Sequence, residues 1–148
     1  LDYDLRSGRT YMYFRGEPLY PFGYGLSYTN FAYGNLELSA KRLSPGEVLV
    51  VRVDVTNTGD RAGDEVVQLY GQHLHSAFDR PRRELKGFRR LTLLPGETHT
   101  VDLVLDWNAL AHWNPDAGRF ETETGTVRLM IGSSSADIRL TTDITLAQ

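Results

Sequence analysis

Apolar and polar residues alternate through most of the chain after residue 30, the pattern of β-strands that bury one face. The clearest run has Leu49, Val51, Val53 and Val55 on one face and Arg52, Asp54 and Thr56 on the other. A second clear run places Val127, Leu129 and Ile131 on one face. Val53 and Leu129 are each the middle apolar residue of such a run, so we expect both side chains at the centre of the core.

Further alternating runs lie near residues 36–38, 67–73, 91–93, 101–105 and 138–146. Turn sequences rich in Gly, Pro, Asn and Asp separate them about every dozen residues, as in antiparallel β-sandwiches. The segment 106–113 is less regular and is predicted to hold one helical turn. The chain is therefore predicted to be all-β, with seven or eight strands in an antiparallel β-sandwich over residues 31–148.

Residues 1–30 do not follow this pattern. The stretch RTYMYFRGEPLYPFGYGLSY at 9–28 places many aromatic rings among prolines and glycines, which interrupt helices and strands. We interpret it as an irregular connector arm whose rings are buried against something else. The end near Tyr28 and Phe31 should dock on its own sandwich, and the end near Tyr11 and Phe14 should be covered elsewhere.

The side chains expected to contact that partner are Arg9, Tyr11, Tyr13, Phe14, Tyr20, Phe22 and Tyr24. Without a partner, the exposed arm could also support self-association.

The composition of the chain mainly excludes classes of partner and of membrane protein. The chain has 148 residues, no cysteine and a net charge of -3, and no run approaches the apolar length of a membrane span. An acidic balance gives no global attraction to nucleic acid or anionic membranes, so we expect neither as a partner. The lack of cysteine does not fix the compartment. The location stays unknown from the sequence, and the periplasm or the cell exterior is favoured over the cytoplasm.

Residue chemistry alone indicates no catalytic, cofactor or metal site. His73 and His75 are two apart and would point to one side of a strand, but His99, His112 and the carboxylates offer no third ligand at a recognisable spacing. We therefore expect solvated histidines at a strand end. The carboxylates near residues 60–65 sit in or beside a turn, and nothing places two of them across a cleft as a glycosidase requires.

Two further features have alternative explanations. Six basic residues crowd into one short stretch: Arg80, Arg82, Arg83, Lys86, Arg89 and Arg90. Such a run could bind phosphates, but pairing with acidic neighbours or with another domain is favoured in an acidic chain. Trp107 and Trp113 could stack on a sugar, although packing in the core or at its rim is favoured.

Several long segments resemble one family. GRTYMYF at 8–14 and EPLYPFGYGLSYTNF at 17–31 resemble the segment that enters the C-terminal domain of family 3 glycoside hydrolases, the β-glucosidases and β-xylosidases. VTNTGDRAGDEVVQLY at 55–70, RPRRELKGFRRLTLLPGET at 80–98 and GSSSADIRL at 132–140 resemble the fibronectin type III-like domain of that family. The resemblance covers nearly the whole chain and implies an immunoglobulin or fibronectin type III-like sandwich.

The resemblance also implies a role. In that family the catalytic carboxylates belong to two preceding domains, and neither of their motifs occurs here, so no catalytic residue is assigned and this chain alone should not be an enzyme. The chain would be a non-catalytic accessory domain whose partners are the catalytic domains of the parent glycosidase, which hydrolyses β-linked glucosides or xylosides. A carbohydrate-binding module and a general fibronectin-type protein-interaction module remain the alternatives.

Overall fold

The computed structural model describes residues 4–148, so the first three residues of the predicted arm lie outside the described residues. The described residues form ten strands and two short 3-10 helices. The elements are η1 (Leu5–Ser7), β1 (Phe31–Leu38), β2 (Arg42–Leu43), β3 (Val48–Asn57), β4 (Gly63–His73), β5 (Glu84–Leu93), β6 (Thr98–Asp106), η2 (Trp107–Leu110), β7 (His112–Asn114), β8 (Arg119–Glu121), β9 (Gly125–Gly132) and β10 (Ile138–Leu146).

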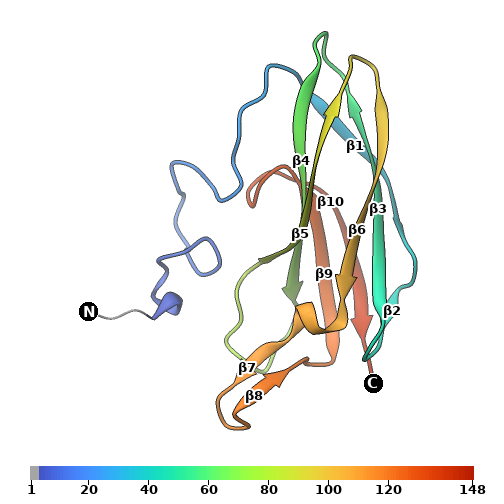
Figure 1. The fold of residues 1–148 in the computed structure, drawn as a ribbon. Helices are drawn as coiled ribbons and strands as arrows, with labels where there is room; N and C mark the ends of the chain where they lie inside the picture. Colours follow the sequence, from blue (N-terminus) through green and yellow to red (C-terminus); the bar gives the residue numbers. More distant parts are fainter. Residues whose placement is uncertain (1–3) are drawn as a thin grey trace.

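The strands form a two-layer sandwich with a small hairpin at one end (Figure 1). One sheet has the order β1-β3-β6, the other has the order β2-β10-β9-β4-β5, and β7 pairs with β8. The long strands pair antiparallel, while the two-residue β2 pairs parallel with β10. The predicted all-β sandwich is confirmed. Seven strands are eight or more residues long, and the additional three are only two or three residues long.

The core lies between the two sheets and is built from the predicted alternating positions. Val53 and Leu129 are both fully buried, as expected from their central places in β3 and β9. Trp107 of η2 also packs into this core, which confirms the packing interpretation of that residue and the predicted helical turn.

The outer face of the three-stranded sheet is polar and internally paired. The Arg52 guanidinium of β3 binds the Asp102 carboxylate of β6 at 2.7 Å, and Asp54 accepts a hydrogen bond of 2.6 Å from the Thr100 hydroxyl. Such residues are satisfied in water and need no cover. This face is therefore typical of a solvated surface.

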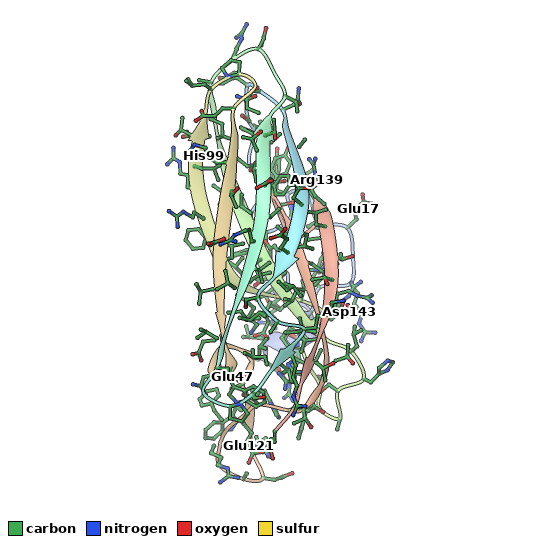
Figure 2. The ribbon with its side chains drawn as sticks, turned by 90° about the vertical axis from the view of Figure 1, so that its right-hand side faces the viewer. Glu17, Glu47, His99, Glu121, Arg139 and Asp143 are labelled. Atoms are coloured by element: carbon green, nitrogen blue, oxygen red, sulfur yellow. The ribbon has the colours of Figure 1, made fainter. Side chains whose placement is uncertain are left out.

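The arm lies on the other side of the molecule, beside β4 and β5 of the five-stranded sheet (Figure 1). Figure 2 shows Glu17 of the arm on the same side as Arg139 and Asp143 of β10, with His99 of β6 on the opposite side. Apart from η1, no helix or strand is assigned between residues 4 and 30. The predicted irregular arm is therefore present in the described residues.

Candidate interdomain surface

The arm is anchored to the sandwich at its C-terminal end by a buried amide. The Thr29 hydroxyl donates to Asn57 Oδ1 at 2.7 Å, and Asn57 Nδ2 donates to the carbonyls of Arg61 and Leu93. Asn57 is fully buried, so these bonds satisfy polar atoms that water cannot reach. The single Asn57 side chain thus joins the arm to the turn after β3 and to the end of β5.

The expected docking of this end is right for Phe31 and wrong for Tyr28. Phe31 belongs to the core, whereas Tyr28 is 93% exposed. The physical reason is that the small Thr29 side chain, not the preceding ring, reaches the buried amide of Asn57. Thr29 is therefore the residue that docks at this end of the arm, and Tyr28 is left in solvent.

A second anchor is the half-buried ring of Tyr11. It stacks on Phe22 at 4.0 Å between centroids and meets the edge of Tyr70 at 6.3 Å. Its hydroxyl accepts a hydrogen bond of 2.9 Å from the Leu85 backbone N–H. Burial raises the pKa of Tyr11, so the phenol stays neutral. The expectation that this end of the arm is covered elsewhere is therefore wrong for Tyr11, which its own sandwich covers.

The third anchor lies on the outer face of β4. Gln68 and Tyr70 point away from the core cluster yet are buried, and the Tyr70 hydroxyl donates to Gln68 Oε1. Gln68 Nε2 donates to the carbonyls of Gly23 and Ser133. Gly23 has a φ of 78°, and a Cβ there would collide with the Gln68 side chain. Only glycine lets the arm approach β4 this closely.

Loop residues complete the contact. The Ser135 N–H donates to the Phe22 carbonyl at 2.8 Å, and the Arg82 N–H donates to the Met12 carbonyl at 2.8 Å. The Arg83 guanidinium donates to the Ser135 carbonyl. The loop before β5 and the loop after β9 therefore hold the arm between them.

The rest of the arm exposes large apolar side chains to solvent. Leu19, Leu26 and Tyr28 are 88%, 89% and 93% exposed. The more weakly exposed members of this surface are Phe14, Tyr20, Phe22 and Tyr24. Tyr20 and Tyr24 contact each other with ring centroids 5.5 Å apart. An apolar surface of this kind is typical of a protein-contact site.

A groove of about 870 Å³ runs beside the anchored part of the arm. Its walls are aromatic rings and prolines of the arm together with residues of the two flanking loops. The lining residues are Arg9, Thr10, Tyr11, Met12, Phe14, Gly16, Pro18, Tyr20, Pro21, Phe22, Arg82, Arg83, Ser135 and Ala136. Three arginines and no Asp or Glu occur among them, although the chain as a whole is acidic.

The groove brings together five of the seven predicted contact residues: Arg9, Tyr11, Phe14, Tyr20 and Phe22. Tyr13 and Tyr24 do not line it. Tyr13 is half-buried, and burial raises its pKa. Whether any of the seven contacts another domain stays a prediction.

The sequence interpretation missed the exposed Leu19 and Leu26 and the outward-facing pair Gln68 and Tyr70. The available signal was a large aromatic residue, Tyr70, at the outward position of a strand, which indicates that something covers that face.

The histidine prediction needs a correction. His73 is not solvated, because its Nε2 atom is buried without a hydrogen-bond partner among the described residues. Burial and the nearby charge of Arg80 lower the pKa of His73 to about 4, against a smaller opposing effect of Glu123. The imidazole is therefore neutral at pH 7. Residues 4–148 contain no group of three His, Cys, Asp or Glu side chains placed to hold a metal ion.

The same buried cluster holds the loop between β4 and β5 in place. The Glu123 carboxylate accepts hydrogen bonds from the Ser76 hydroxyl at 2.6 Å and the Ala77 N–H at 2.8 Å, and it pairs with Arg80 at 3.5 Å. Arg80 also donates to His112 Nδ1 at 2.9 Å. Burial alone would raise the pKa of Glu123, but these hydrogen bonds and the arginine charge lower it overall.

Five of the six residues of the basic run fall into two groups, and the sixth, Arg89, is exposed on β5. Arg80, Lys86 and Arg90 pair with Glu123, Glu84 and Asp64 respectively, as favoured from the sequence. Arg82 and Arg83 instead face the groove.

The remaining aromatic candidates do not form a flat platform. Trp113 of β7 is exposed and meets Phe120 of β8 edge to face, with an angle of 71° between the rings. The two rings therefore offer no extended flat platform on which a sugar chain could stack. In the described part of the chain, no helix is long and apolar enough to cross a membrane.

The fold and the anchored arm define a fibronectin-like β-sandwich domain. Residues 65–135 match the fibronectin type III-like domain family. The chain is 44% identical over 124 residues to the thermostable β-glucosidase B of Acetivibrio thermocellus. This alignment covers 84% of this chain and 16% of that protein. It is 43% identical over 130 residues to a β-xylosidase of Formosa agariphila, covering 87% of this chain and 18% of that protein.

Solved structures agree. A β-glucosidase from Listeria innocua in complex with glucose matches with a TM-score of 0.82 and 37% identity, over 89% of this chain and 18% of that one. The GH3 β-glucosidase of Bifidobacterium adolescentis matches with a TM-score of 0.78 and 36% identity, over 86% of this chain and 18% of that one. The chain belongs to the fibronectin type III-like domains of glycoside hydrolase family 3 β-glucosidases and β-xylosidases. It spans 16 to 18% of the length of these four relatives.

Proposed function

We propose that this chain is a non-catalytic C-terminal accessory domain that stabilises the catalytic domains of a family 3 β-glycosidase acting on β-linked glucosides or xylosides. The arm is the connector to those domains, and its exposed side is the surface that packs against them. The relatives support this proposal, because the matched part is only 16 to 18% of their length and they are named as β-glucosidases and β-xylosidases.

One observation carries the proposal. The arm is anchored at both ends and near its middle, yet it exposes Leu19, Leu26 and Tyr28 almost completely. A segment that is held in place while it presents apolar side chains outward is suited to dock against a second protein surface. The outer face of the three-stranded sheet has paired charges instead, so the contact side is the one that carries the arm.

Hydrogen exchange tests this assignment. Backbone amides of residues 17–28 should exchange much more slowly in the full-length protein than in the 148-residue chain, because the catalytic domains would cover them. Amides of the outer-face segment 98–102 should exchange alike in both proteins. Equal exchange of residues 17–28 in the two proteins would contradict the proposal. Slowing that depends on protein concentration would instead indicate self-association through the arm.

The proposal also predicts that the 148-residue chain hydrolyses neither aryl β-glucosides nor aryl β-xylosides. No family catalytic motif occurs in its sequence, and glycosidases need two suitably spaced carboxyl groups. The measurement is chromophore release at high protein concentration, with the full-length protein as the positive control. Hydrolysis that survives repurification and is lost on substitution of a carboxylate of this chain would overturn the accessory role.

A further inference from the structure

The groove beside the arm has a chemistry of its own. Its walls combine apolar rings with three guanidinium groups, from Arg9, Arg82 and Arg83. Arg9 and Arg82 are exposed, and Arg83 is half-buried while it binds the Ser135 carbonyl. The lining itself therefore carries basic groups and no carboxylate, in a chain of net charge -3, although Glu17 adjoins the lining residues Gly16 and Pro18 and the charge of Glu84 acts on Tyr11.

The walls are held in place rather than free to collapse. Tyr11 and Phe22 are stacked on each other and tied to β5 and to the Ser135 N–H. Arg82 is fixed through its backbone N–H to Met12 and contacts the Phe14 carbonyl at 3.4 Å. A preformed concave site of this kind loses little conformational entropy when it is filled.

The position of the groove indicates the source of its occupant. It shares Phe14, Tyr20 and Phe22 with the exposed surface of the arm, so the two are continuous. The first described residues also lie close by, because Gly8 packs near the backbone of Phe14. Polypeptide that precedes the arm in the proposed parent enzyme would therefore enter beside this groove.

We infer that the groove is a docking site for a protruding segment of the preceding catalytic domain of the same polypeptide, with an apolar side chain at its tip and a carboxylate beside it. The apolar side chain enters between the rings of Phe14 and Phe22, and the carboxylate binds the exposed guanidinium groups of Arg9 and Arg82. This inference rests on the proposed function and specifies the chemistry of its partner surface.

Photo-cross-linking in the full-length protein tests the inference. Benzoylphenylalanine replaces Ala136, an exposed residue of the groove, and in a control it replaces Ala62, an exposed residue of the turn between β3 and β4. The probe at 136 should form an intramolecular cross-link to a peptide outside residues 1–148 that contains Asp or Glu. The probe at 62 should give none.

A charge reversal sharpens the test. Arg9→Glu should lower the cross-link yield from position 136 by about tenfold, because it opposes a carboxylate. Arg15→Glu makes the same charge change on the same arm outside the groove, and it should leave the yield unchanged.

Three results would overturn the inference: a cross-link confined to residues 1–148, a cross-link to a second copy, or a peptide that lacks Asp and Glu. If residues 17–28 are still protected from hydrogen exchange in the full-length protein, the accessory role stands and only the groove assignment fails. If those residues are unprotected as well, the proposed function fails with it.

Discussion

Single buried side chains decide the stability of this domain. Val53 and Leu129 are fully buried in β3 and β9, within one continuous cluster between the sheets. Truncation of either to alanine removes apolar contacts and leaves a cavity, so each variant should lose about 2 to 4 kcal/mol of unfolding free energy. Urea unfolding of the 148-residue chain measures this loss. Val104→Ala, at an exposed position of β6, is the control and should change stability by less than about 0.5 kcal/mol.

His73 should make stability depend on pH. Its folded-state pKa of about 4 lies below the ordinary value of 6.5, because burial and the charges of Arg80 and Lys86 outweigh the opposing effects of Glu123 and of a backbone hydrogen bond with Leu110. Between these two values the unfolded chain binds a proton and the folded chain does not. Unfolding free energy should therefore fall as the pH is lowered from about 6.5 to about 4.

The matched measurement is urea unfolding at pH 7.5, 5.5 and 4.5. His73→Gln should show a smaller fall across this window than the wild type, while His99→Gln, at an exposed position of β6, should keep the wild-type fall. Glu123 acts at lower pH, because its lowered pKa gives a stabilisation that is lost only below about 4.5. Identical pH profiles for His73→Gln and the wild type would contradict the assignment of the neutral buried imidazole.

At the scale of elements, the arm is fixed to the sandwich at several points along its length and does not extend freely into solvent. Tyr11 tethers its N-terminal part, through its stack on Phe22 and its hydrogen bond from the Leu85 N–H. Tyr11→Leu should accelerate hydrogen exchange at the amides of Leu85 and Arg82. The Leu85 N–H loses the Tyr11 hydroxyl as its acceptor, and the Arg82 N–H binds the carbonyl of Met12, whose position depends on the neighbouring Tyr11. The expected loss of stability is about 1 to 3 kcal/mol.

The control for this prediction is Tyr28→Leu. It removes a ring of the same arm that touches little of the sandwich, because Tyr28 is 93% exposed. Exchange at Leu85 and Arg82 should be unchanged in this variant. If the two variants accelerate exchange equally, the arm is held by its general apolar character and not by the Tyr11 tether.

The long strands could be predicted from the sequence and the contacts of the arm could not. Alternation over eight or more residues fixes which face of a strand is buried, as Val53 and Leu129 show. The short β2, β7 and β8 contain too few residues to carry any period. The arm has no period either, so nothing local in its sequence distinguishes the docked Tyr11 from the exposed Tyr28.

Gln68 illustrates a second limit of prediction from the sequence, which is that contacts between distant segments leave no local pattern. In sequence it is a polar residue between Val67 and Leu69, and alternation alone would place it in solvent. In the structure it is buried because a segment 45 residues earlier, at Gly23, covers it and accepts its hydrogen bond. Such a contact depends on how distant segments meet, which a strand pattern does not encode.

At the scale of the whole molecule, the two outer faces of the sandwich differ in how much apolar surface they expose to solvent. One outer face is mostly polar, with pairs such as Arg52 with Asp102, and exposes only scattered apolar side chains such as Val104. The other is covered in part, at β4 and β5, by an arm whose own outer side is apolar at Leu19, Leu26 and Tyr28, while β9 and β10 keep an exposed ion pair between Arg128 and Asp143. This asymmetry orients the domain against its proposed parent, with the arm side inward and the β1-β3-β6 sheet outward.

The double variant Leu26→Ser/Tyr28→Ser distinguishes a role of these side chains in the interdomain contact from a role in the stability of the domain itself. Both side chains are nearly fully exposed in this chain, so its unfolding free energy should change by less than about 0.5 kcal/mol. In the full-length protein the same side chains would be buried against a catalytic domain, and their loss should weaken the contact. The half-life of glycosidase activity on heating should therefore shorten several-fold, while initial activity at 25 °C stays the same.

Val104→Ser is the control, since it removes an exposed apolar side chain from the sheet that should face solvent. It should leave both the isolated chain and the heated enzyme unchanged. Equal destabilisation of the isolated chain and the full-length protein by the double variant would mean that Leu26 and Tyr28 support the local fold. No effect in either protein would show that the middle of the arm is not part of the interface, and the orientation of the domain would have to be reversed.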